Sequence, residues 1–548
     1  MSGLTSRPSR GRRLPRRRAL PALAAALAFP LLVTACGGAP PKPGPDDSPA
    51  AYSGVGVDDD RIDYAVGKLE KIITEERDAS GVPGVAVAVV HRGETVFARG
   101  FGVRDTTTGV PVDESTVFPL ASVSKAVSAT VVAAETAHSD VGWSTPVRDV
   151  LPDFALADPR ITPMVTVGDL FAHRSGLPEH AGDDLEDLGF DRAEILRRLR
   201  ELPLTPFRAS YAYTNFGVTA AAEGVARAAG TPWDELGRER IFDPLGMADT
   251  SYSHEDLLSR PNRAVGHVRA GGDGAWTPAV PGRDPDAQSP AGGVSSSVTD
   301  MARWTAMVLA DGRGPGGAEV VPAAALREAL TPQSVAVPPQ TGSDRPGEYG
   351  FGFTLGTTSS GRVQWGHSGA FLLGAGTSVL MLPSLELGIV TLTNAAPVGL
   401  AETINARFAD LAQYGDPTFD WGGLYAGAFA PLSAPAGDLA SEQPPADPTP
   451  SRPLDDLRGE YRNPYFGPLR IGRAGGALTL EVGRGRPPVP LRHWKGDTFA
   501  GGMSGEGWSP GSLGSVTFDG DTVRVDLLDD AGRGTFTRVR PAPRGEDG

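Results

Sequence analysis

A serine and a lysine three residues apart are the first pattern in this 548-residue chain that could do chemistry. Ser122 and Lys125 stand at the start of a predicted helix, so their spacing places both side chains on one face. There the lysine amine could take or polarise the serine hydroxyl proton and make the serine a nucleophile. The pair alone is a weak signal, because an N-cap serine beside a surface lysine gives the same spacing.

Two further motifs lie downstream in an order that strengthens the signal. Tyr213-Thr214-Asn215 stands in a turn before a helical stretch, and Trp365-Gly366-His367-Ser368-Gly369-Ala370 precedes late strands. With Ser122 and Lys125, these motifs resemble the serine β-lactamase and penicillin-binding-protein superfamily. The resemblance is closest to the branch of class C β-lactamases, carboxylesterases and D-amino-acid peptidases. Supporting matches lie at residues 170–178, 242–247 and 291–296.

The resemblance implies a role for each motif residue. Ser122 would be the acylated nucleophile, and Lys125 would favour an ionised or proton-sharing Tyr213, which would act as the general base. Asn215 would bind the substrate's acyl side and orient Lys125. The backbone N–H groups of Ser122 and Ala370 would form an oxyanion hole. The substrate-binding positions are then Asn215, His367, Gly369 and Ala370.

The third motif departs from the penicillin-recognising pattern, which carries Lys-Thr-Gly or a close relative. His367 stands where that lysine would bind the substrate carboxylate. A neutral imidazole is the weaker anchor for a carboxylate near neutral pH, so His367 favours ester or peptide substrates over β-lactams. The alternative is a structural histidine beside a glycine turn.

We therefore expect a serine hydrolase that forms an acyl-enzyme on an ester, an amide or a D-amino-acid peptide. One alternative is a β-lactamase or D,D-carboxypeptidase acting on β-lactams or peptidoglycan stem peptides. Another is a catalytically idle lipoprotein that binds peptidoglycan. The substrate would be a small molecule or peptide, which could derive from the cell wall. The sequence leaves the oligomeric state open.

Other site types have weaker support. Ser368 and Ser509 lie in glycine-flanked patterns like the nucleophile elbow of α/β-hydrolases, but neither stands between a predicted strand and a predicted helix. His173 and His180 have no third metal ligand at a useful spacing, so we expect no metal. No organic cofactor is implied either.

The N-terminus has the organisation of an export signal. Seven arginines lie between Arg7 and Arg18, an apolar run follows to Ala35, and small residues precede Cys36, the single cysteine. We expect a signal peptide at 1–35 with a lipobox that ends at Cys36, a disordered tether at 36–57, and lipid anchoring to the outer face of a bacterial cell membrane. Cleavage near Ala35 without lipidation is the alternative. The twin-arginine and Sec export routes both stay open.

The remaining chain predicts two folded domains. Helical patterns at 60–76, 122–137, 192–201, 219–229, 299–309 and 401–411 lie between strand patterns at 85–98 and at 351–354, 376–382 and 387–393. This order indicates an α+β domain at 58–415, with an antiparallel sheet, flanking helices and a helical subdomain. A linker at 416–453 then leads to short strands at 454–548, typical of an all-β barrel and similar to the lipocalin-like domain of some related hydrolases. The net charge of −15 argues against a nucleic-acid partner.

Overall fold

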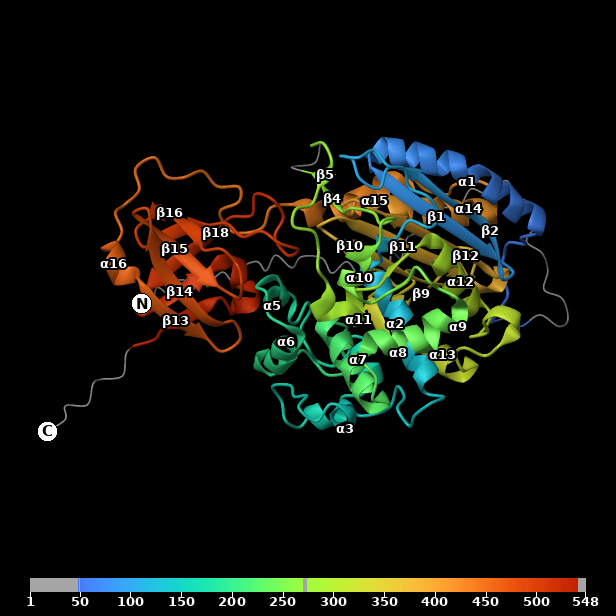
Figure 1. Ribbon diagram of the computed structural model, residues 1–548, viewed down its shortest axis with the longest axis horizontal. Coiled ribbons are helices and arrows are strands. Elements are labelled where there is room, and N and C mark those ends of the chain that lie inside the picture. Colours follow the sequence, from blue (N-terminus) through green and yellow to red (C-terminus); the bar gives the residue numbers. More distant parts are fainter. Residues whose placement is uncertain (1–47, 49, 270–273, 541–548) are drawn as a thin grey trace, which may run out of the picture.

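The computed structural model describes residue 48 and residues 50–269 and 274–540. A large domain of sheet and helices lies beside a smaller barrel (Figure 1). The predicted α+β domain and the predicted β-barrel are both confirmed. The signal segment 1–35 and Cys36 lie outside the described residues. Among the described helices, none combines the length and the apolar character needed to span a bilayer.

The large domain is built on an eight-stranded sheet that both ends of its sequence complete. The strand order is β2-β1-β12-β11-β10-β9-β8-β7, and β1 pairs antiparallel with β12, which lies about 300 residues later. The strands are β1 (Gly84–His91), β2 (Glu94–Gly102), β7 (Ser334–Val337), β8 (Gly347–Tyr349), β9 (Thr354–Thr357), β10 (Val363–Phe371), β11 (Ala375–Leu382) and β12 (Leu387–Thr393).

Strand β1 is buried on both faces, and its alternating residues enter two different cores. Val85, Val87 and Val89 pack with the helices α1 (Asp59–Ser80) and α14 (Leu400–Tyr414). Ala86 and Ala88 face the opposite layer, which contains α2 (Ser124–Glu135) and α12 (Val298–Leu309). The sheet is therefore the middle of three layers, and α2 lies in the layer that includes the helical subdomain (Figure 1).

The helical subdomain fills most of the chain between α2 and α12. It includes α3 (Val147–Val150), α4 (Val167–Phe171), α5 (Asp183–Asp187), α6 (Arg192–Arg198), α7 (Asn215–Ala229), α8 (Trp233–Gly237), α9 (Asp243–Leu245), α10 (His254–Ser259) and α11 (Ser289–Gly292). Two short two-stranded sheets pair β3 (Phe118–Pro119) with β6 (Ser295–Ser296) and β4 (His267–Val268) with β5 (Thr277–Pro278). The helix α13 (Ala323–Ala329) follows α12.

The C-terminal strands close into a barrel in sequential order. They are β13 (Gly459–Asn463), β14 (Gly467–Ala474), β15 (Ala477–Val482), β16 (Val489–Lys495), β17 (Thr498–Gly501), β18 (Gly514–Asp519), β19 (Thr522–Val525) and β20 (Thr535–Arg538). Pairing of β13 with β20 removes the free edges, and the short helix α16 (Leu454–Leu457) precedes the barrel. The barrel contacts the large domain next to α5 (Figure 1).

Two segments differ from the sequence-based expectations. The strand expected at 351–354 begins only at Thr354, because Phe351 stacks on Trp143 with ring centroids 4.5 Å apart and Phe353 is fully buried. Gly352, at a φ of 76°, passes so close to α2 that a Cβ there would lie 2.5 Å from the carbonyl oxygen of Lys125. Hydrophobic packing on the helical layer thus replaces sheet pairing in this segment.

The segment expected as a linker, 416–453, contains the helix α15 (Trp421–Phe429). Its aromatic residues recur four apart at Trp421, Tyr425 and Phe429, which is helical spacing. Phe429 is buried, and α15 packs on α14. Residues 434–453 form no helix or strand.

Candidate active site

Ser122 lies in a short 3-10 turn, Ala121–Val123, that runs directly into α2. Ala121 has a φ of 46°, a left-handed conformation that costs a residue with a side chain about 1–3 kcal/mol. Its side chain packs with Phe371 and Ala375 of the neighbouring hairpin, which helps to hold this conformation. The turn leaves Ser122 partly exposed while the helix that follows it is buried.

Lys125 is completely buried, and its amine has three hydrogen-bond partners. Nζ donates to Ser122 Oγ (3.1 Å), to Asn215 Oδ1 (2.6 Å) and to the carbonyl oxygen of Ala291 (2.9 Å). Burial lowers the pKa of Lys125 to about 7, and the negative charge of Asp183 opposes this shift. Lys125 can therefore lose its proton near neutral pH.

Tyr213 completes the group around Ser122. Its ring centroid lies 4.6 Å from the amine of Lys125, and its phenol is hydrogen-bonded to Ser122. Desolvation raises the pKa of Tyr213 well above its usual value, although the hydrogen bond from Ser122 opposes the shift. The sequence analysis expected an ionised or proton-sharing Tyr213; burial favours the neutral phenol and makes Lys125 the more easily deprotonated group.

Asn215 links the amine of Lys125 to an acidic residue that the sequence motifs did not indicate. It is the first residue of α7, and its Nδ2 donates to Asp183 Oδ2 (2.9 Å). The same oxygen lies 3.0 Å from His180 Nδ1. Asp183 stands at the start of α5 and has no characteristic spacing from the three motifs, so only the fold reveals its contact with Asn215.

His367 is buried in β10, and both ring nitrogens already have partners within the protein. Nε2 lies 2.8 Å from the hydroxyl of Tyr349, and Nδ1 lies 2.6 Å from the carbonyl oxygen of Ser368. These partners assign the proton to Nδ1, with Nε2 as the acceptor. Burial, followed by the nearby charge of Lys125, lowers the pKa of His367 to about 3. The imidazole is therefore neutral, as the sequence analysis expected.

Gly369 and Ala370 bring the edge of β10 to the serine. A Cβ at Gly369 would lie 2.4 Å from the carbonyl oxygen of Leu120 and 3.0 Å from the backbone nitrogen of Ser122, so glycine is required for this approach. The pairing of β10 with β9 ends at Gly366, whereas its pairing with β11 continues to Phe371. The edge that carries Gly369 and Ala370 is thus available to face Ser122.

The alternative sites are not assembled. Ser368 lies inside β10 and donates to Glu402 of α14, on the other side of the sheet from Ser122, and Ser509 donates to the carbonyl oxygen of Leu432 (3.0 Å). Neither serine stands between a strand and a helix, so the elbow interpretation is wrong. His173 is buried against the ring of Tyr213, at 4.5 Å. Across the described part of the chain, no group of three potential metal ligands comes together.

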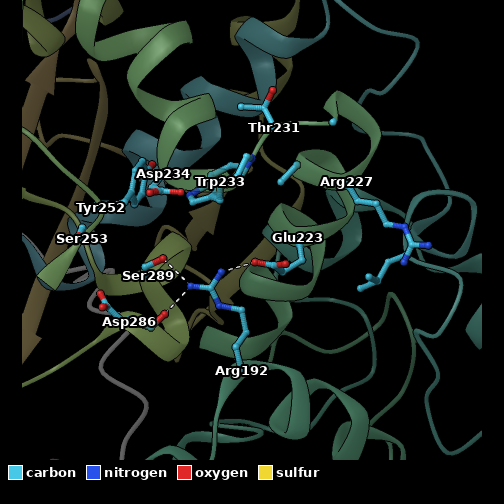
Figure 2. Close-up of a pocket in the computed structure, with 14 residues that line it drawn as sticks. Arg192, Glu223, Arg227, Thr231, Trp233, Asp234, Tyr252, Ser253, Asp286 and Ser289 are labelled. Atoms are coloured by element: carbon cyan, nitrogen blue, oxygen red, sulfur yellow. Dashed lines mark hydrogen bonds and ion pairs between the residues drawn. The ribbon is translucent and has the colours of Figure 1, made fainter. Parts of the chain in front are cut away.

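A separate surface pocket of about 710 Å³ lies between α7, α8 and α11. Figure 2 shows Arg192 in this pocket with its guanidinium directed at Glu223, Ser289 and the backbone of Asp286. None of the candidate catalytic residues lines the pocket. Because none of these catalytic candidates reaches it, we do not assign the chemistry to this pocket.

Comparisons with known proteins agree with this geometry. Residues 69–414 match the family described as Beta-lactamase, which is more than half of the chain. The chain belongs to the beta-lactamase family. Residues 443–523 match a domain of unknown function, DUF3471. The family match thus confirms the predicted superfamily and the general class of serine hydrolase.

Several curated relatives match between about a third and three quarters of the chain. An unguisins hydrolase of Aspergillus violaceofuscus is 26% identical over 74% of this chain and 76% of its own length. Penicillin-binding protein 4 of Amycolatopsis lactamdurans is 32% identical over 53% of this chain and 75% of its own length. Esterase EstB of Burkholderia gladioli is 30% identical over 34% of this chain and 51% of its own length.

A solved structure shares the fold. The octameric penicillin-binding protein homologue from Pyrococcus abyssi superimposes with a TM-score of 0.57 at 20% identity, over 86% of this chain and all of that one. At this identity the likeness concerns the fold alone.

Proposed function

We propose that the protein hydrolyses esters, amides or D-amino-acid peptides through an acyl-enzyme on Ser122. The observation that carries the proposal is the contact of Ser122 Oγ with both Lys125 Nζ, at 3.1 Å, and the phenol of Tyr213. A buried amine with a pKa near 7 is a suitable general base at neutral pH. Relatives named as an esterase, a D-aminopeptidase and an unguisins hydrolase support the choice of substrate classes.

The first half of the reaction transfers the acyl group to Ser122. The neutral amine of Lys125 takes the hydroxyl proton as Oγ attacks the substrate carbonyl carbon. The backbone N–H groups of Ser122 and Ala370 stabilise the oxyanion, each contributing about 3–4 kcal/mol where the geometry is good. The bond to the leaving group then breaks, and the leaving group takes the phenolic proton of Tyr213. Lys125 returns its extra proton to the phenolate.

The second half transfers the acyl group to water, with Lys125 again as the base. A water molecule gives one proton to the neutral Lys125 as its oxygen attacks the acyl carbon, and the second tetrahedral intermediate expels Ser122 Oγ. That oxygen receives the proton back, which restores the starting state. Asn215 holds Lys125 through Oδ1, and Asp183 fixes Asn215 from the other side, so the amine keeps its direction toward Ser122.

A β-lactamase or D,D-carboxypeptidase activity is the second candidate, and His367 disfavours it. The imidazole is buried and neutral, and both nitrogens are engaged by Tyr349 and Ser368, so it offers no positive charge to a substrate carboxylate. A non-catalytic peptidoglycan-binding role is disfavoured because Ser122, Lys125 and Tyr213 come together in one contact group.

A substrate panel tests the proposed activity. Purified wild-type protein and Ser122→Ala would be assayed on p-nitrophenyl esters, D-amino-acid anilides and nitrocefin. We expect turnover of an ester or anilide by the wild-type protein only, and little turnover of nitrocefin. Rapid nitrocefin hydrolysis would contradict the interpretation of His367, and activity in Ser122→Ala would contradict the role of Ser122.

We also propose that Cys36 carries a lipid that holds the protein on the outer face of the cell membrane. The support is the sequence alone: a basic segment, an apolar run and small residues before the single cysteine. Expression of the full gene and of Cys36→Ser in a bacterial host tests it. We expect the wild-type protein in the detergent-extracted membrane fraction with a diacylglycerol mass increase, and neither result for the variant.

A further inference from the structure

The barrel domain reaches the candidate active site through one glutamate. Glu506 lies in the barrel segment between β17 and β18, and its carboxylate accepts two backbone hydrogen bonds from the large domain. The donors are Leu372 N (2.6 Å) and Leu373 N (3.2 Å). Both belong to the tight turn that joins β10 to β11, two and three residues after Ala370.

This turn lies against the segment that carries the nucleophile. Phe371, at its start, and Ala375, at its end, pack on Ala121, the strained residue directly before Ser122. On another side, Gly374 approaches Gly266 so closely that a Cβ on Gly374 would lie 2.4 Å from the Cα of Gly266. A displacement of the turn would therefore change the position of Ala370 relative to Ser122.

The backbone of the same barrel segment is also bonded to the helix α5. Asp187 of α5 accepts hydrogen bonds from Glu506 N (3.0 Å) and Gly507 N (2.6 Å). Asp183, one helical turn earlier on α5, accepts from Asn215, which in turn holds Lys125. Glu506 is thus part of a chain of contacts between the group that holds Lys125 and the strand that carries Ala370.

Other hydrogen bonds join the barrel to α5 and the residues beside it. Tyr465 of the barrel is buried and donates its hydroxyl proton to Asp184 Oδ1 (2.5 Å), while Gly182 N donates to the same hydroxyl (3.1 Å). The backbone nitrogen of Arg484 donates to the carbonyl oxygen of Leu188 (2.7 Å). Glu506 therefore lies beside an interface at which several parts of the barrel contact α5 and its neighbouring residues.

We propose that Glu506 is a positioning residue for the hydrolytic reaction: through the β10–β11 turn it holds the backbone N–H of Ala370 at the oxyanion position opposite Ser122. The inference rests on the proposed function, because it assigns a role within the same acyl-transfer reaction. It predicts that loss of the carboxylate weakens stabilisation of the transition state more than binding of the substrate, so kcat falls while KM changes little.

Steady-state kinetics of the full-length protein on a short p-nitrophenyl ester test the proposal. We expect kcat to fall about tenfold in Glu506→Ala with KM within about twofold, because the position of one oxyanion donor is relaxed but the donor is not removed. Glu506→Gln keeps one carbonyl acceptor and should retain more of the kcat than Glu506→Ala. The control is Glu460→Ala, which removes an exposed glutamate on β13 and should leave both constants unchanged.

Thermal unfolding of each variant separates positioning from stability. If Glu506→Ala is folded and its kcat is within about twofold of wild type, or only KM rises, the proposal is wrong. If Glu506→Ala does not fold, the kinetics of Glu506→Gln and Asp187→Asn test the proposal instead. An unchanged kcat in both of these variants would overturn the positioning role of Glu506. Ser122→Ala is assayed in parallel: activity in that variant contradicts the proposed function, whereas inactivity there with normal kcat in the Glu506 variants contradicts the positioning role alone.

Discussion

At the scale of single residues, the buried amine of Lys125 decides how the serine can be activated. Burial lowers its pKa to about 7 and raises that of Tyr213, so the group that changes protonation in the neutral range is the amine. Two mechanisms are possible: neutral Lys125 acts as the base, or ionised Tyr213 acts as the base beside a protonated Lys125. They make opposite predictions about how kcat/KM changes as the pH rises.

We predict that kcat/KM rises with pH through about 7, because only the neutral amine of Lys125 can accept the proton of Ser122. The measurement is kcat/KM for an amide substrate, whose own hydrolysis is slow, between pH 5 and 9. A rate that instead falls as Lys125 loses its proton would favour the ammonium and an ionised Tyr213.

Asp183 supplies a second test of the same titration. Its negative charge raises the pKa of Lys125, so Asp183→Asn should lower that pKa and move the acidic limb of the kcat/KM profile to lower pH. The matched control is Asp153→Asn, an exposed carboxyl elsewhere on the large domain, which should leave the limb in place. If the acidic limb of Asp183→Asn moves to higher pH, the limb does not report the titration of Lys125.

At the scale of elements, the site depends on how closely β10 approaches the turn before α2. The sequence predicted the helix of Ser122 and Lys125 and the turn before α7, because their periodic patterns and motifs are local. It did not predict that the His367 motif lies within a strand, since glycines at 366 and 369 weaken the strand pattern. These glycines are explained by close backbone approaches, which only the fold reveals.

We predict that Gly369→Ala lowers kcat by at least about 100-fold, because its methyl group would meet the carbonyl oxygen of Leu120 and the nitrogen of Ser122. The control is Gly356→Ala on β9, where an added Cβ has no neighbour within 4 Å. Kinetics and melting temperature of the two variants are compared. Normal kcat in a folded Gly369→Ala would show that this approach is not needed for catalysis.

At the scale of the whole molecule, the barrel and the large domain share an interface beside the candidate active site that could not be predicted from sequence. The barrel strands were recognisable from their turn spacing, but the contacts of Glu506, Asp187 and Tyr465 join residues that lie about 130 to 320 positions from their partners. No local pattern marks such pairs.

Glu402 of α14 is likewise buried on the other side of the sheet from the candidate active site, where it accepts a hydrogen bond from the hydroxyl of Ser368.

The buried carboxyl of Glu402 predicts a pH-dependent stability difference. Burial raises its pKa from 4.5 to about 7, so the folded state favours the neutral acid, and its contribution to stability is full below pH 4.5 and declines as the pH rises to about 7. Glu402→Gln cannot ionise, so its stability relative to wild type should increase over this range, by at most about 3 kcal/mol, and stay constant above it.

Urea unfolding of wild type and Glu402→Gln at pH 4.5, 6, 7 and 8 measures this difference, and the comparison cancels the titration of all other groups. A difference that is independent of pH would show that Glu402 does not carry a raised pKa in the folded protein.

The central claim is that Ser122 is acylated, and peptide mass spectrometry after labelling tests it most directly. The wild-type protein and Ser122→Ala are incubated with a fluorophosphonate, digested and mapped. We predict one adduct per wild-type chain, on the peptide that contains Ser122 and Lys125, and no adduct on Ser122→Ala. An adduct on another serine, or labelling of Ser122→Ala to the wild-type extent, would contradict the account.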